Sequence, residues 1–190
     1  TGFAVLIGLH LGLSDDSLEV IFTATQMHDT GLLSIDPEQA AAIDRMNFEQ
    51  EQAVYLKQIS LASLFLDKVP SLSKKVSKAV FMHNERKDGS GWPKGIIGDK
   101  NSIESQVVGI GVMLHDIYSK KLKARGYGTR HLLPKLQMEA EGLDPDIFSS
   151  ALEILRQGAH GSAQIMPAEF MPDLSQYLMT LQRRLFSWFE

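Results

Sequence analysis

Neighbouring histidine and aspartate side chains are the residues of this 190-residue chain that could do chemistry. His28-Asp29 stands just before Gly31, and His115-Asp116 repeats the pair further along the chain. A neutral imidazole with a carboxylate suits iron, manganese or zinc. Within a helix such neighbours point about 100° apart, so only one residue of the second pair could face a given cavity. The alternative for each pair is a structural or solvated role.

A third histidine, His83, stands at the expected end of a helix, next to the polar, glycine-rich segment 85–95. Such a loop could close over a phosphate or line a metal site, and the alternative is a surface loop between helices. The chain contains no cysteine, which excludes thiolate zinc sites, iron–sulfur clusters and cysteine nucleophiles. Any metal must therefore bind through histidine, carboxylate, amide or backbone oxygen.

Composition limits the function classes. With 19 basic and 23 acidic residues the net charge is -4, which argues against a DNA- or RNA-binding protein. A local basic run over 120–130 could form a phosphate-binding rim or a solvated helix end. No apolar run reaches the roughly 18–20 residues that a membrane span needs. The lack of cysteine fits a cytoplasmic protein, and the Thr1 start suggests a segment cut from a longer protein.

The elements that must position these residues are helices. Apolar residues recur at helical spacing in every periodic segment, and no segment alternates as a strand would. We predict helices that end near 11, begin at 15 and 37, and cover 49–66, 72–84, 103–122, 131–141 and 144–156. Ser14 or Asp15 is the expected cap of the second helix, and Asp36 caps the third. The fold class is therefore all-α.

We expect the chain to divide into two parts. Residues 1–156 form one helical domain, and residues 157–190 form a linker and a C-terminal amphipathic helix. Leu174, Leu178, Leu181 and Leu185 give that helix an apolar stripe at helical spacing. The stripe would suit a protein partner or a homodimer, and packing onto the domain's own core is the alternative.

The motifs together resemble the HD-GYP branch of the HD phosphohydrolase superfamily. That branch carries the loop motif His-His-Glu-x-x-Asp-Gly-x-Gly-Tyr-Pro. Residues 83–93 read His-Asn-Glu-Arg-Lys-Asp-Gly-Ser-Gly-Trp-Pro. The His28-Asp29 pair precedes the loop, and the segment at Arg125 resembles the family's Arg-Pro-Tyr-Arg. The resemblance covers roughly residues 4–156 and implies an HD-domain bundle of about seven helices.

The resemblance implies a specific activity. The family hydrolyses the bacterial second messenger cyclic di-GMP to pGpG or GMP, using two or three iron or manganese ions that hold a hydroxide. Carried over by position, His28, Asp29 and His83 are the expected metal ligands, and Asp29 is also the expected catalytic residue. The expected substrate-binding residues are Asp88, Gly89, Gly91, Trp92, Pro93, Arg125 and Tyr127.

The chain departs from the family at other ligand positions. Gln58 and Asn84 stand where the family has histidines, and their amides are poor transition-metal ligands. Val112 stands in place of an aspartate, and Leu32 in place of the lysine that assists at the phosphate. His115 lies one helical turn after Val112 and could substitute for the lost ligand. The result would be a partial iron or manganese site, or no metal at all.

Two functions therefore remain open. The first is a degenerate, non-catalytic signalling or interaction domain of cyclic di-GMP pathways that could still bind the nucleotide. The second is a metal-dependent cyclic di-GMP phosphodiesterase with an altered ligand set. The glycine-rich loop argues against a third function, that of the related non-hydrolytic HD-like regulatory module, because such modules should lack this loop.

Overall fold

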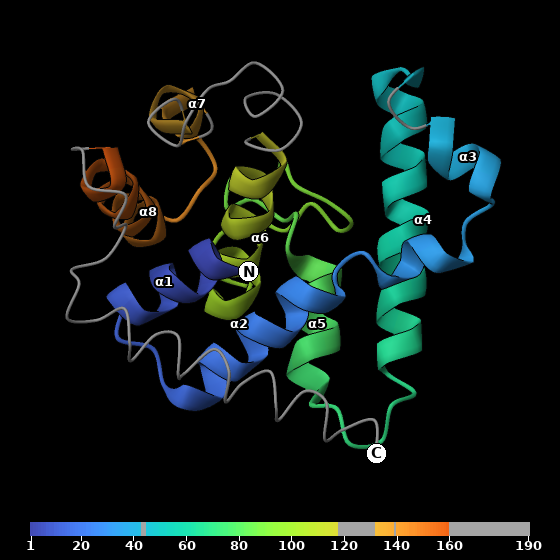
Figure 1. Ribbon diagram of the computed structural model, residues 1–190, viewed down its shortest axis with the longest axis horizontal. Coiled ribbons are helices and arrows are strands. Elements are labelled where there is room, and N and C mark those ends of the chain that lie inside the picture. Colours follow the sequence, from blue (N-terminus) through green and yellow to red (C-terminus); the bar gives the residue numbers. More distant parts are fainter. Residues whose placement is uncertain (43–44, 118–131, 139, 160–190) are drawn as a thin grey trace.

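The computed structural model describes residues 1–42, 45–117, 132–138 and 140–159, and the regular secondary structure of these residues is helical (Figure 1). Its elements are α1 (Gly2–His10), α2 (Asp15–Met27), the 3-10 helix η1 (Thr30–Ser34), α3 (Pro37–Ala42), α4 (Phe48–Leu66), α5 (Lys74–Met82), α6 (Ile103–Asp116), α7 (Leu132–Met138) and α8 (Pro145–Ala159). No strand occurs among the described residues, so the all-α prediction is confirmed. Outside the described residues lie the predicted C-terminal helix, Arg125 and Tyr127.

Side-chain caps fix where the site-bearing helices begin. Ser14 caps α2 by accepting a hydrogen bond from the Ser17 backbone N–H at 3.3 Å, as predicted. Asn47 and Gln50 form a reciprocal capping box at the start of α4. Each cap satisfies backbone N–H groups that a helix leaves unpaired at its first turn. The helix starts therefore set which residues face the interior.

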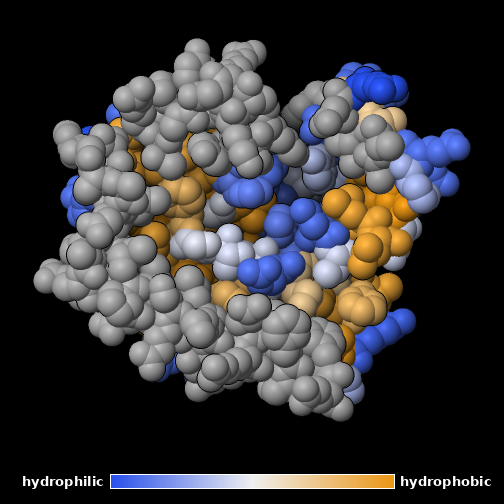
Figure 2. Space-filling view, viewed as in Figure 1, coloured by the Kyte–Doolittle hydropathy of each residue, from blue (hydrophilic) through white to orange (hydrophobic). Residues whose placement is uncertain are grey.

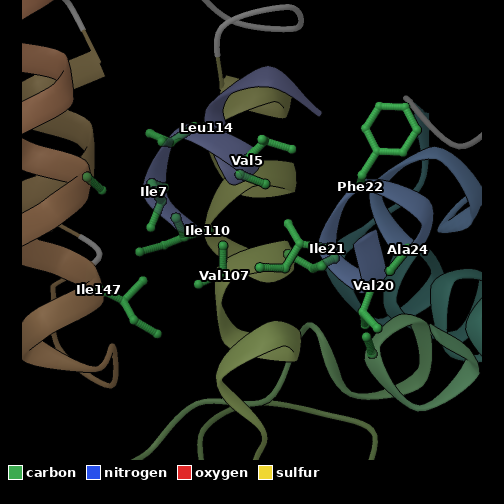
Figure 3. Close-up of a cluster of buried hydrophobic side chains, with 14 of the residues drawn as sticks. Val5, Ile7, Val20, Ile21, Phe22, Ala24, Val107, Ile110, Leu114 and Ile147 are labelled. Carbon is green, nitrogen blue, oxygen red and sulfur yellow. The ribbon is translucent and has the colours of Figure 1, made fainter. Parts of the chain in front are cut away.

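The core lies where α1, α2, α5 and α6 pack together, with α8 against α1 and α6. Figure 3 shows Ile110 of α6 close to Ile7 of α1 and Ile147 of α8, and all three are at most 1% exposed. Burial of an aliphatic side chain of this size stabilises the fold by about 1.5–3 kcal/mol. This apolar core holds the ends of α2, α5 and α6 in place.

Two glycines set the close approaches that bring the chemical residues together. A Cβ atom on Gly31 would lie 1.9 Å from the Gln58 carbonyl oxygen, and one on Gly109 would lie 1.9 Å from the His83 carbonyl oxygen. Because any side chain would overlap these backbone atoms, only glycine allows η1 to approach α4 and α6 to approach the end of α5 this closely.

Helix α4 stands beside the bundle and packs on η1 and α5 (Figure 1). Its inner face lines one side of a cavity, and the ends of α2, α5 and α6 line the other. Within the described residues, no helix combines the length and apolar character needed to cross a bilayer.

Candidate functional site

The hollow between α4 and the bundle is a cavity of about 420 Å³. Hydrophilic side chains gather near the centre of the face shown in Figure 2, with apolar side chains to their right. The cavity brings together five of the predicted metal-binding, catalytic and substrate-binding residues, namely His28, Asp29, His83, Trp92 and His115. Val112 and His115 both line it, as expected from their spacing of one helical turn. Asp116 lines it as well, so the expectation that only one residue of the His115-Asp116 pair could face a given cavity is wrong.

His83 caps the C-terminus of α5 and is 3% exposed. Its Nδ1 lies 2.7 Å from the Val80 carbonyl oxygen, which can only accept, so Nδ1 carries the proton. Burial lowers the pKa of His83 to about 4, and the ring is therefore neutral with its lone pair on Nε2. Asn84 donates its side-chain N–H to that lone pair at 3.2 Å.

His28 lies at the end of α2 and is arranged in the same way. Its Nδ1 donates to the Thr25 carbonyl oxygen at 3.0 Å, and its Nε2 lies 3.2 Å from Oδ2 of Asp29. When Nε2 is protonated, this contact is an ion pair within the His-Asp pair. The rings of His28 and His83 meet edge to face, with centroids 5.9 Å apart and planes 86° apart.

Gln58 projects from α4 toward the same pair and is 2% exposed. Its amide nitrogen donates to the His28 carbonyl oxygen and lies 3.4 Å from Oδ1 of Asp29. Both neighbours only accept hydrogen bonds, which fixes the nitrogen toward the His-Asp pair and leaves the amide oxygen without a partner. At this position the side chain is a hydrogen-bond donor and not a ligand.

These contacts decide whether the residues fit the metal centre that the resemblance implies. A metal ion needs the lone pairs of His28, His83 and Asp29, but an N–H group of Asn84 occupies Nε2 of His83, and the Gln58 amide nitrogen lies 3.4 Å from Oδ1 of Asp29. Val112 contributes only an apolar surface. Among the described residues, no three histidine or carboxylate side chains are grouped so that they could hold a metal ion. The donor set does not fit the expected centre.

The glycine-rich loop is anchored by buried charge. Glu85 is 3% exposed, and its two carboxylate oxygens accept the backbone N–H groups of Lys94 at 2.5 Å and Ile96 at 3.0 Å. A Cβ atom on Gly91 would lie 2.2 Å from the Arg86 backbone nitrogen, so the loop folds tightly on itself. The motif glutamate therefore closes the loop.

Lys87 ties the loop to the start of α8. Its ammonium lies 2.6 Å from Asp99 and 2.9 Å from Asp144. Hydrogen bonds to Asp99 and Asp144 raise the pKa of Lys87. Burial alone would raise the pKa of Asp144, but hydrogen bonds from Lys87 and from the first backbone N–H groups of α8 lower it.

The predicted substrate-binding residues divide into three groups. Trp92 lines the cavity. Asp88 accepts hydrogen bonds from the Ser90 backbone N–H at 2.9 Å and hydroxyl at 2.6 Å, and its carboxylate serves the loop turn with Gly89 at φ +82°. Asp88, Gly89, Gly91 and Pro93 do not line the cavity, and Arg125 and Tyr127 lie outside the described residues.

Two further cavity residues on α4 that carry polar groups were not predicted from the sequence. Glu51 and Tyr55 precede Gln58 at spacings of seven and three residues, so the three share one face of α4. The Tyr55 ring lies 6.5 Å from the Trp92 ring, centroid to centroid. The helical spacing of Glu51, Tyr55 and Gln58 was the available signal.

Comparisons with known proteins show which family the chain resembles. The HD domain family profile matches residues 1–147. Over 125 residues the chain is 28% identical to the cyclic di-GMP phosphodiesterase response regulator RpfG of Xanthomonas campestris pv. campestris, covering 65% of this chain and 32% of that protein. Over 105 residues it is 25% identical to the cyclic di-GMP phosphodiesterase PdeB of Borreliella burgdorferi, covering 55% of this chain and 27% of that protein.

The chain thus spans about a third or less of the length of these relatives. Both relatives are named as cyclic di-GMP phosphodiesterases, in agreement with the resemblance to the HD-GYP branch. Because the profile takes in the His28-Asp29 pair, the loop 83–93 and most of the helical bundle, the chain belongs to the HD domain family.

Proposed function

We propose that this chain is a non-catalytic HD-GYP-like domain that works in cyclic di-GMP signalling by protein contact, without hydrolysis. One observation carries the proposal: an amide N–H of Asn84 is directed at Nε2 of His83, and the amide nitrogen of Gln58 faces Oδ1 of Asp29. An N–H group beside a ligand lone pair repels a cation and competes for that lone pair. The geometry thus favours a site held together by its own hydrogen bonds.

The surrounding residues support the same conclusion. Metal-dependent phosphodiester hydrolysis needs a metal-bound hydroxide and a positive charge at the phosphate. Val112 and Leu32 line the cavity at the positions where the resembling family has an aspartate and a lysine. Neither side chain can hold a metal ion or stabilise negative charge. Several requirements of the reaction are therefore missing at once.

A second candidate is a metal-dependent cyclic di-GMP phosphodiesterase with an altered ligand set. The observation that favours it is the position of His28, Asp29, His83 and His115 around one cavity. Such a site would hold one iron or manganese ion. It requires Asn84 to release the His83 Nε2, and for that reason we place it second.

The partners and the cellular location of this domain are also proposals. The two relatives carry cyclic di-GMP in their names, and we propose that this domain belongs to a pathway using that nucleotide. The predicted amphipathic helix over 174–189 remains our candidate contact with a protein partner or a second copy. A cytoplasmic location remains the prediction.

The test is a combined metal and turnover assay. The chain is purified under conditions that protect Fe(II), bound iron and manganese are measured per chain, and cyclic di-GMP is incubated with it. We expect neither stoichiometric metal nor pGpG or GMP. Two metal ions per chain with pGpG formation would overturn the proposal, and one metal with turnover would establish the second candidate.

A further inference from the structure

We propose that the cavity beside the His-Asp pair binds an organic cation carrying a guanidinium or primary ammonium group. The inference rests on the proposed function, because it assigns a ligand to a cavity that is not used for hydrolysis. At about 420 Å³ the cavity lies in the range of small-molecule sites and is far larger than a single metal ion requires.

The charge of the cavity wall selects a cation. Carboxylates of Asp29, Glu51 and Asp116 line the cavity, and none of its lining residues in the described part of the chain is lysine or arginine. A phosphodiester would bring further negative charge and be repelled. A cation is attracted, and the attraction is stronger in a partly enclosed space than in bulk water.

Two acceptors on α4 are available to such a ligand. The Glu51 carboxylate makes no hydrogen bond or ion pair with the described residues. Gln58 is 2% exposed, and its amide oxygen has no hydrogen-bond partner there, since both of its hydrogen bonds come from the nitrogen. The amide oxygen can therefore accept a hydrogen bond from a ligand. An N–H group of a ligand in the cavity would satisfy it.

An aromatic pair distinguishes an organic cation from a metal ion. The Tyr55 and Trp92 rings both line the cavity, with centroids 6.5 Å apart and planes tilted by 39°. Cations bind over the faces of tryptophan and tyrosine rings, and a planar guanidinium also stacks on them. Acceptor oxygens on α4 and ring faces at the cavity wall together match a guanidinium better than a compact metal ion.

Fluorescence of Trp92 gives a local readout. The chain has two tryptophans, Trp92 and Trp188, so a Trp188→Phe variant reports Trp92 alone. This variant is titrated with methylguanidinium and, as a neutral control of the same shape, methylurea. We expect a saturable change with methylguanidinium only. An equal response to both compounds, or a response to Mn²⁺ and not to methylguanidinium, would overturn the inference.

Charge-neutral variants locate the site. Glu51→Gln should weaken methylguanidinium binding by about tenfold, because a charge-assisted hydrogen bond is lost. Glu49→Gln is the matched control, since Glu49 lies exposed on the same helix and does not line the cavity. Unchanged binding by Glu51→Gln would also overturn the inference.

Binding measurements can distinguish two sources of the guanidinium group. Argininamide represents a free small cation, and an arginine-containing peptide represents a protein side chain; tighter binding of either identifies the source and supports the site. Hydrolysis of cyclic di-GMP would overturn the proposed function and leave this titration unaffected. No methylguanidinium binding in a chain without hydrolysis would overturn this inference alone.

Discussion

The glycine-rich loop and the histidine side of the cavity differ in what their family motif residues do. In the loop, Glu85 matches the motif and closes the loop through two backbone N–H groups, and Lys87 links it to Asp144. On the histidine side, His28-Asp29 is present, but the Gln58 amide is turned toward it as a donor, and the Asn84 amide donates to His83. A matching motif can therefore reflect folding in one region and leave the chemistry of the other undetermined.

Whether a histidine can bind a metal depends on which of its ring nitrogens donates and which accepts a hydrogen bond. His28 and His83 both present Nδ1–H to a backbone carbonyl, the orientation that frees Nε2 for a metal. In this chain Nε2 of His83 receives an amide proton. His28 and His83 thus keep the ring orientation of metal ligands, while Asn84 occupies the ligand atom of His83.

The largest expected effect is on the histidine side, at Gly109. Gly109→Ala would place a methyl group 1.9 Å from the His83 carbonyl oxygen and force α5 and α6 apart. We expect it to lower the free energy of unfolding by about 3 kcal/mol, measured by urea denaturation. Gly2→Ala is the control, because nothing lies within 4 Å of that position. Equal stability of the two variants would contradict the described packing.

The next effect concerns the loop. Glu85→Gln removes the charge that holds the Lys94 and Ile96 N–H groups, and an amide can accept only at one of its two ends. The free energy of unfolding should fall by about 2 kcal/mol, against no change for the exposed Glu38→Gln. A loop region as stable with glutamine as with glutamate would show that its closure does not depend on charge.

The smallest effect is pH-dependent and lies at the junction of the loop with α8. The pKa of Asp144 is lowered in the fold, so its contribution is present above its ordinary value of 3.8 and is lost as pH falls through the lowered value. Asp144→Asn keeps the cap of α8 and removes the charge facing Lys87. It should cost about 1 kcal/mol or less at pH 7. In acid denaturation profiles, a difference that persists undiminished below the lowered pKa would argue against the ion pair.

Most of the fold could be predicted from the sequence because its signals are local. Ser14 and Asp36 cap the helices that follow them, and apolar spacing marks each helix. Helix α6 is described as far as Asp116, and positions 118–122 of its predicted span lie outside the described residues, whereas α8 continues to Ala159, beyond the predicted 156. Helix ends depend on tertiary packing, which local patterns do not contain.

The cavity was only partly predictable. His28, His83 and His115 were placed from motif and spacing, but Glu51 and Tyr55 enter the cavity only because Gly31 lets η1 pack closely on α4. The sequence also indicated that the amides of Gln58 and Asn84 are poor ligands. It could not indicate that the Gln58 nitrogen faces the His-Asp pair and that the Asn84 nitrogen faces His83, since that depends on which acceptors lie opposite in space.

Titration of the chain with Mn²⁺, followed by calorimetry, tests the central claim most directly. The matched protein is the double variant Gln58→His/Asn84→His, in which both amide donors are replaced by imidazole ligands. We predict no stoichiometric binding by the natural sequence and uptake of Mn²⁺ by the double variant. Stoichiometric Mn²⁺ binding by the natural sequence, as tight as that of the variant, would contradict the account.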